Sequence, residues 1–156
     1  MPRSIVTSRP SVLKAVLNLW PPYWGTGIRV VSVSQDWLRM RVEMRRHFYN
    51  VNAFGTHFGG SLYAMCDPHL ALLLVRHLGA QYVVWDKAAS IEFVAPGRGT
   101  VGAEFEWSPA ELECIRQKTA DGARFEPEKT VEVTDDRGCL IARVRKTLYV
   151  RRRKTG

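Results

Sequence analysis

The segment from Asn52 to Leu74 places one carboxylate, Asp67, inside almost unbroken apolar sequence. Moving a charge out of water costs several kcal/mol unless the charge is paired or hydrated. A carboxylate with little water around it also has a raised proton affinity, so it can act as a general base or attack an electrophile directly. Asp67 is therefore the first candidate for a chemical role.

Two glycines, Gly59 and Gly60, stand where the apolar run begins and where we expect a helix to start. The first N–H groups of a helix have no partner within it, and the helix dipole is positive there. Because glycine has no side chain, a substrate can approach this backbone closely, and an N–H at Gly60 can hold a developing oxyanion. Asn52 offers both a donor and an acceptor, which suits orienting a water or a carbonyl. Its other interpretation is a side chain that holds a loop turn.

Asp67 also has a structural interpretation, because Pro68 follows it. Asp followed by Pro at the first helical position is typical of a helix start, and the carboxylate is then a cap. If the helix begins near Gly60 instead, Pro68 lies about two turns inside it and can kink it beside Asp67. The residue at which the helix begins therefore decides between the chemical and the structural role.

The remaining candidates carry weaker patterns. His57, His69 and His77 show no recognisable metal-ligand spacing, so no metal site is predicted. Ser61, one residue past the glycine pair, is most simply a helix cap. Cys66 is most simply a thiol of the core.

Hydrophobic periodicity predicts the elements that hold these residues. Apolar side chains at every second position indicate half-buried strands, at 27–34, 38–44, 82–95, 100–107 and, as a hairpin turning at 135–138, 128–153. Apolar residues on all sides of 60–78 predict one long buried helix that ends at a Gly79 cap. Shorter helices are predicted over 11–20, which the stretch PPYWGTG stops, and over 108–122, which opens with a capping box formed by Ser108 and Glu111.

These elements predict an α+β fold. Antiparallel strands need one covered face, and a curved antiparallel sheet wrapped around one long buried helix provides it with the parts available. We expect a single domain over 1–156, with a short N-terminal helix at 11–20 and a core over 28–150.

Composition limits the class of protein. A chain with 46% hydrophobic residues has enough apolar material for a core and is not a disordered chain. The net charge of +8 favours an anionic partner, such as nucleic acid, anionic lipid or a phosphate-bearing cofactor, although plain solubility explains it equally well. Three scattered cysteines without a CxxC pair favour a reducing cytoplasm.

No apolar run is long enough to span a membrane without a charge. The first 20 residues resemble a transit or signal segment slightly, because they hold no acidic residue. Lys14 and Asn18 interrupt the apolar part of this segment, however, so a short amphipathic helix is the better interpretation.

The glycine loop and the carboxylate together form a spaced pattern. It reads Asn-x-x-Gly-x-x-His-Gly-Gly, with an acidic residue seven positions after the last glycine, and it is carried here by Asn52, Gly55, Gly59, Gly60 and Asp67. With the element order over about 28–150, this pattern resembles the hotdog-fold acyl-CoA thioesterases, especially the phenylacetate-degradation type and related poorly characterised hotdog domains. One position departs, since Phe58 occupies the usual His position and His57 lies one residue early. The stretch HFGG is also similar to hotdog dehydratases, whose Pro-Gly-His continuation is replaced here by Gly-Gly-Ser.

The resemblance implies a hotdog fold and hydrolysis of an acyl-CoA thioester to the free acid and coenzyme A. It implies that Asp67 is the general base or nucleophile, that the Gly60 amide holds the oxyanion, and that Asn52 orients the water or the carbonyl. The substrate contacts that it implies are His57, Phe58, Gly59, Ser61 and Arg98. Coenzyme A then enters as part of the substrate, with no separate cofactor.

The resemblance also implies self-association. In the family the Asp and the Asn-Gly loop come from different subunits, so a homodimer or homotetramer is expected, and a monomer should be inactive. The alternative function is a non-catalytic acyl-CoA or lipid-binding module on the same fold. A nucleic-acid contact through the basic tail around Tyr149 ranks below both, because such a tail is more simply a solvated strand end.

Overall fold

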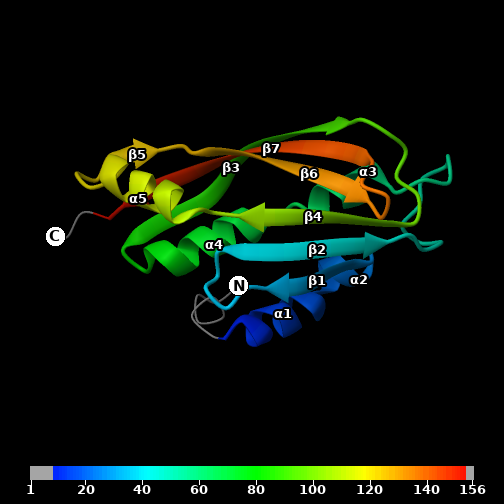
Figure 1. Cartoon of the computed structure of the whole chain (residues 1–156), viewed down its shortest axis with the longest axis horizontal. Helices are drawn as coiled ribbons and strands as arrows, with labels where there is room; N and C mark the ends of the chain where they lie inside the picture. The colour runs from blue at the N-terminus through cyan, green and yellow to red at the C-terminus, as the bar shows by residue number, and fades with distance from the viewer. Residues whose placement is uncertain (1–8, 154–156) are drawn as a thin grey trace.

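The computed structural model describes residues 9–153 (Figure 1). Residues 1–8 of the transit-like segment, and residues 154–156 at the end of the basic tail, lie outside the described residues. The helices are α1 (Pro10–Asn18), α2 (Pro21–Trp24), α3 (Gly59–Ala64), α4 (His69–Leu78) and α5 (Pro109–Lys118). The strands are β1 (Ile28–Val33), β2 (Arg39–Arg45), β3 (Tyr82–Phe93), β4 (Thr100–Glu106), β5 (Arg124–Phe125), β6 (Glu128–Asp135) and β7 (Leu140–Arg152).

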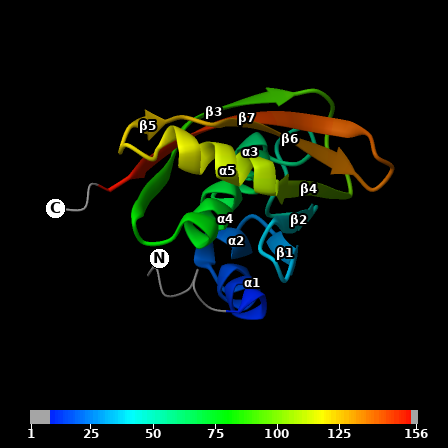
Figure 2. The ribbon, with the colours of Figure 1, turned by 60° about the vertical axis from the view of Figure 1, so that its left-hand side comes forward.

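The strands form one antiparallel sheet in the order β1-β2-β4-β6-β7-β3, with the short β5 paired to β7. Figures 1 and 2 show the sheet curving around α3 and α4, with α1 lying along β1 at one edge. Side chains alternate as predicted: in β2, Met40, Val42 and Met44 are buried, while Arg39 and Arg41 are exposed. The predicted α+β architecture is therefore confirmed, and β5 is the one strand that the sequence did not indicate.

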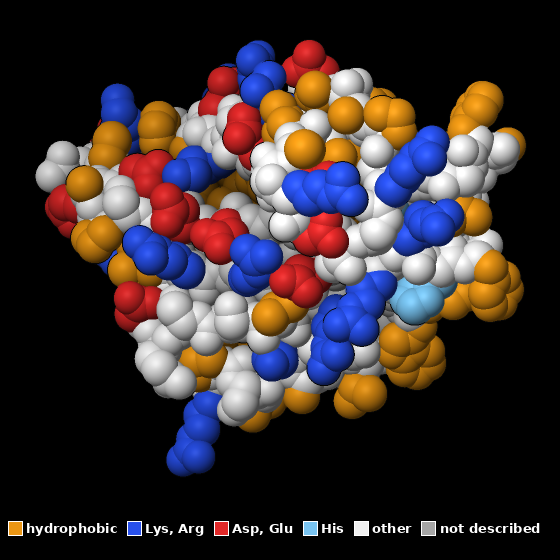
Figure 3. All heavy atoms as spheres, turned by 45° about the vertical axis from the view of Figure 1, so that its right-hand side comes forward, with side chains coloured by type: hydrophobic (Ala, Val, Ile, Leu, Met, Phe, Trp, Pro, Cys, Tyr) orange, Lys and Arg blue, Asp and Glu red, His pale blue; other side chains and the backbone are white. Residues whose placement is uncertain are grey.

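The outer face of the sheet is covered by ion pairs. Arg41 contacts Glu43 and Glu104 at 3.1 Å each, and Arg143 contacts Glu132 at 3.1 Å and Glu92 at 3.3 Å. Figure 3 shows Lys and Arg side chains interleaved with Asp and Glu on one face of the molecule. The positive net charge therefore does not form a continuous basic strip on this face.

The prediction of a single long helix over 60–78 is wrong in one respect. It is divided into α3 and α4, which are separated by residues 65–68. Pro68 explains the division, because proline has no N–H to donate and its ring clashes with the carbonyl four residues earlier. The predicted C-cap is confirmed, since Gly79 follows α4 with a φ of 80°.

Two other boundaries show how proline acts. The stretch after α1, predicted only to stop that helix, forms the short helix α2, because Pro21 and Pro22 have the φ that a first helical turn requires. The capping box of α5 is confirmed: the Glu111 amide donates to the Ser108 hydroxyl at 3.2 Å, and the Ser108 amide donates to the Glu111 carboxylate at 2.8 Å.

The N-terminal helix predicted over 11–20 is confirmed as α1, which buries Leu13 and Leu17. Its last residue, Asn18, also completes the edge of the sheet. The Asn18 side chain accepts from the Val30 amide at 2.7 Å and donates to the Val30 carbonyl at 3.0 Å. This pair of bonds occupies backbone groups that an edge strand otherwise presents to other chains.

Candidate active site

Asp67 lies in the segment between α3 and α4, where it meets a buried cation. Its Oδ1 is 3.0 Å from Nζ of Lys146 in β7, and the same Nζ is 3.2 Å from Oδ2 of Asp86 in β3. The Lys146 side chain is 1% exposed, against 42% for Asp67 and 19% for Asp86. One ammonium group thus joins two carboxyl groups, of which Asp67 is the one that solvent reaches more easily.

Asp67 does not cap the helix that follows it. The N-cap position of α4 belongs to Pro68, and no side chain of the described residues caps this end. The backbone carbonyl of Asp67 accepts a hydrogen bond of 2.8 Å from the Tyr23 hydroxyl, which ties α2 to the segment. A helix does start at Gly59, as the chemical interpretation of Asp67 required, and a second starts directly after Pro68.

The shared ammonium separates the proton affinities of the two carboxyl groups. Burial raises the pKa of Asp67, but hydrogen bonds with Asp86 and Lys146 outweigh it and bring that pKa below its ordinary value. Burial raises the pKa of Asp86 to about 6, and the nearby Asp67 adds to the increase against the opposing effect of Lys146. Burial lowers the pKa of Lys146, yet the two carboxylates raise it overall, so the lysine stays charged.

The other titratable groups near Asp67 are neutral. Burial lowers the pKa of His69 to about 3 and raises the pKa of Cys66 to about 12. Burial and the adjacent Asp67 raise the pKa of Tyr23, whose hydroxyl also lies 3.1 Å from Nε2 of His69. The charge state of this region is therefore set by the two aspartates and the lysine.

A second group of predicted residues gathers elsewhere. A hollow of about 520 Å³ is lined by Asn52, His57, Gly59 and Arg98, together with Phe93 and neighbouring residues of the two loops. Within one chain the hollow and the carboxylate are thus separate, because Asp67 is not among the lining residues.

The loop around the hollow is held by Asn52 and His57. The Asn52 side chain accepts from the amides of Phe54 at 2.9 Å and Thr56 at 3.2 Å, and donates to the Thr56 hydroxyl at 2.9 Å. The His57 Nε2 lies 3.0 Å from the Gly99 carbonyl, and burial lowers its pKa. These contacts are those of the loop-turn interpretation of Asn52, and they fix the shape of the hollow.

The glycine pair is covered by aromatic rings. A Cβ at Gly59 would lie 2.9 Å from Cζ of Phe93, and a Cβ at Gly60 would lie 2.5 Å from Cε1 of Phe58. The Phe58 ring, at the position usually taken by His, is 55% exposed. Within residues 9–153 the amides of Gly59 and Gly60 have no hydrogen-bond acceptor, as expected at a helix start. Ser61 is buried in the first turn of α3 and does not cap it.

Lys146 and Asp86 are the functional candidates that sequence reasoning missed. In β7 the inward positions Ala142, Val144, Leu148 and Val150 are all buried, and Lys146 occupies the position between Val144 and Leu148. A lysine on the apolar face of a predicted strand must find a carboxylate, and this is the signal that the sequence contained.

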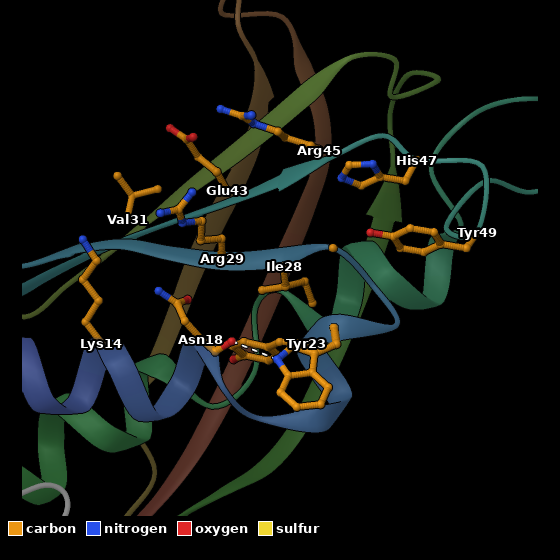
Figure 4. Close-up of a pocket in the computed structure, with 12 residues that line it drawn as sticks. Lys14, Asn18, Tyr23, Ile28, Arg29, Val31, Glu43, Arg45, His47 and Tyr49 are labelled. Atoms are coloured by element: carbon orange, nitrogen blue, oxygen red, sulfur yellow. Dashed lines mark hydrogen bonds between the residues drawn. The ribbon is translucent and has the colours of Figure 1, made fainter.

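A larger hollow of about 720 Å³ lies beside α1 and the strands β1 and β2 (Figure 4). Its polar lining includes Lys14, Arg29, Glu43 and Arg45. None of the predicted site residues lines it, so we do not place the reaction there. Over residues 9–153 no group of His, Cys, Asp and Glu side chains is arranged to hold a metal ion.

A family model described as a domain of unknown function, DUF4442, matches residues 9–150. The chain belongs to the DUF4442 family. No curated protein matches its sequence.

Solved structures share the fold of this DUF4442 chain. PA5026 of Pseudomonas aeruginosa, described as a protein of unknown function and probable thioesterase, has a TM-score of 0.80 at 15% identity, with 97% of each chain covered. The thioesterase HI1161 of Haemophilus influenzae has a TM-score of 0.67 at 15% identity, covering 92% of this chain and 91% of that one. The PaaI protein of the phenylacetic acid degradation operon of E. coli has a TM-score of 0.60 at 16% identity, covering 91% and 90%. The hotdog fold is therefore confirmed.

Proposed function

We propose that this protein is a thioesterase that hydrolyses an acyl-CoA to the free acid and coenzyme A. The observation that carries the proposal is Asp67, a partly exposed carboxylate beside the central helices, whose pKa is held below its ordinary value by Asp86 and by the buried ammonium of Lys146. The description of PA5026 and HI1161, which share the fold, as probable or known thioesterases supports it.

The proposed reaction uses a water molecule. Asp67 takes a proton from the water as its oxygen attacks the thioester carbonyl, and the Gly60 amide holds the oxyanion that forms. The tetrahedral intermediate collapses, the C–S bond breaks, and the thiolate of coenzyme A recovers the proton. Direct attack by the Asp67 carboxylate is the variant of this step, with water then cleaving the anhydride. No separate cofactor enters either route.

The proposed substrate site combines the hollow with the glycine pair. Arg98 is exposed at its lining, where it suits the phosphates of coenzyme A. Asn52 and His57 hold the loop that shapes the site, and Phe58, Gly59 and Ser61 line the helix start. Because Phe58 covers Gly60, we propose that the ring moves when an acyl group binds.

We propose that two copies complete the site. In a single chain Asp67 does not line the hollow, whereas a partner copy can bring its own hollow to Asp67. The edge strand β3 suits this pairing: among residues 9–153 it has a neighbouring strand, β7, on one side only, and residues 87–90 are exposed. Phe93 and Tyr63 near this edge are 57% and 38% exposed. A long strand edge with exposed aromatic side chains beside it is normally covered. We also place the protein in the cytoplasm, where its free cysteines stay reduced.

A panel of acyl-CoA substrates assayed for thiol release tests the function. We expect turnover by the wild type and a loss of about 100-fold or more in Asp67→Asn, since that is the usual contribution of a general base. Asp136→Asn, the same change at an exposed turn, is the matched control and should keep full activity. Full turnover in a folded Asp67→Asn variant would contradict the role of Asp67.

A non-catalytic acyl-CoA or lipid-binding module is the second candidate. It is favoured by the hydrogen bonds that occupy these side chains: Asn52 bonds Thr56 in its own loop, and His57 bonds the Gly99 carbonyl in the neighbouring loop. Binding of acyl-CoA by calorimetry, with no thiol released from any member of the panel, would support this function instead.

A further inference from the structure

Asp67 and Asp86 both contact the ammonium group of Lys146, but they differ in their exposure to solvent. Its Nζ is 3.0 Å from Asp67 and 3.2 Å from Asp86, and its side chain is 1% exposed. Asp67 faces partly into solvent, while Asp86 is the deeper of the two, at 19% exposure. Any reactant that approaches this cluster from solvent therefore meets Asp67 first.

The exposed carboxylate is the weaker base of the pair. Its pKa lies below the ordinary value, whereas burial and the charge of Asp67 raise the pKa of Asp86 to about 6. A general base works best with a pKa near the working pH. Asp67 is thus the residue best placed to contact a water, whereas Asp86 is the residue better suited to hold the proton.

We propose that Asp86 and Lys146 are positioning residues for Asp67, and that the proton taken by Asp67 passes to Asp86 until the thiolate leaves. This inference rests on the proposed thioesterase function. Lys146 holds both carboxyl groups beside one ammonium, at 3.0 Å and 3.2 Å from its Nζ, and Asp86 acts only through Asp67.

The proton balance closes without another reactant. Water loses one proton to Asp67 as the C–O bond forms, and Asp67 passes that proton to Asp86. When the C–S bond breaks, the proton returns through Asp67 to the thiolate. Both carboxylates are then ionised again, and the net reaction consumes one water and releases one acid and one thiol.

The geometry leaves Asp86 an oxygen for this proton. Its Oδ2 contacts Lys146, while its Oδ1 is buried and has no hydrogen-bond partner within residues 9–153. A buried carboxylate oxygen without a partner is unfavourable, and a proton on Asp86 removes the charge that makes its burial costly. The pairing of β3 with β7 is irregular between Asp86 and Ala88. This irregularity directly follows Asp86, whose side chain points inward to Lys146.

Groups on the surrounding elements do not compete for the proton. His69 in α4, Cys66 before it and Tyr23 in α2 are neutral, and each is buried. Tyr63 in α3 presents its ring to the ammonium of Lys146, with 5.8 Å between Nζ and the ring centroid. The charged groups facing Asp86 are therefore Lys146 and Asp67.

The pH dependence of turnover tests the relay. In the wild type we expect kcat to rise with pH through an apparent pKa near 6, because Asp86 must be ionised to receive a proton. Asp86→Asn should lower kcat by about tenfold or more and move this acidic limb to lower pH. Asp86→Glu should restore the limb in part. Glu132→Gln, at an exposed carboxylate of β6 that pairs with Arg143, is the matched control and should leave the profile unchanged.

A second measurement does not depend on activity. Carboxyl carbon NMR should find a group in the wild type that titrates near pH 6 and that disappears in Asp86→Asn. In Asp67→Asn the pKa of this group should fall, because the charge of Asp67 no longer raises it.

The outcomes separate the relay from the proposed function. An unaltered pH profile in folded Asp86→Asn overturns the relay even if the protein is an active thioesterase. A titration of Asp86 that Asp67→Asn does not move overturns the proton sharing. A wild type that releases no thiol, with the NMR titrations as expected, overturns the thioesterase function and shows a pair that shares a proton without this reaction.

Discussion

At the scale of one residue, Lys146 shows that a buried charged side chain requires partners of opposite charge. An ammonium that is 1% exposed is stable only with carboxylates close by, and Asp67 and Asp86 provide them. Removing the lysine leaves two carboxyl groups facing each other without a counter-charge. The stability of the cluster must therefore depend on pH.

We expect Lys146→Met to lower the free energy of unfolding by about 3 kcal/mol at pH 8, the lower end for a broken buried pair because Asp67 is partly in water. Without the ammonium the pKa values of both carboxyl groups rise, so ionising them costs more in the folded state. The loss should therefore shrink as the pH falls through about 6 and towards 4, when both groups become protonated. Urea unfolding of wild type and variant at several pH values measures it.

Lys129→Met is the control for that series. Lys129 pairs with Glu111 at 2.8 Å, but its side chain is 20% exposed and that of Glu111 is 40% exposed. A pair this close to solvent contributes about 1 kcal/mol or less. Equal losses in the two variants, or a Lys146→Met loss that does not change with pH, would show that the charge cluster does not govern stability.

At the scale of elements, Pro68 decides how the central helix presents Asp67. A continuous helix would continue its backbone hydrogen bonds through residues 65–68, whereas the interrupted one leaves the carbonyl of Asp67 for the Tyr23 hydroxyl. The short helix α2, which sequence reasoning treated as a stop, supplies that hydroxyl. The interruption is therefore part of how the candidate base is held.

The edge strand β1 depends on a side chain from α1. Asn18→Ala removes both bonds to Val30, and we expect a loss of about 1 kcal/mol in the free energy of unfolding. Gln117→Ala, at an exposed position of α5 where the side chain bonds the exposed Glu113, should change stability by less than about 0.5 kcal/mol. Thermal or urea unfolding compares the two. If Asn18→Ala is no less stable than Gln117→Ala, water replaces the asparagine without cost.

At the scale of the whole molecule, we propose that the exposed part of β3 is where copies meet. The same strand holds Asp86 and, directly after it, presents residues 87–90 to solvent. If two copies pair along this edge, the assembly and the proton chemistry share one element. Association and activity should then fall together.

Ala88→Lys tests this pairing, because charges are unfavourable along a strand edge that must pair. We expect the wild type to be a dimer or tetramer in sedimentation equilibrium, and the variant to need at least about tenfold higher concentration to associate, with activity reduced in step. Ala120→Lys, an exposed alanine after α5, should associate as the wild type does. A wild type that is monomeric and fully active would rule out a site shared between copies.

The sequence by itself determined the period-two strands, the capped helix α5, the glycine loop and the position of Asp67. These follow from local rules, since side-chain alternation, capping residues and proline act over a few neighbouring positions. They were enough to predict a curved sheet around a central helix. The boundaries in the structure differ from the predicted ones mainly at proline residues.

Only the tertiary structure decided what Asp67 touches. Lys146 is 79 residues away along the chain, and it reaches Asp67 because β7 pairs with β3 beneath the α3–α4 segment. The same folding separated Asp67 from the hollow lined by Asn52 and Gly59, although the local pattern had joined these three residues in one motif. Ion pairing and burial depend on distances between elements, and no local pattern contains those distances.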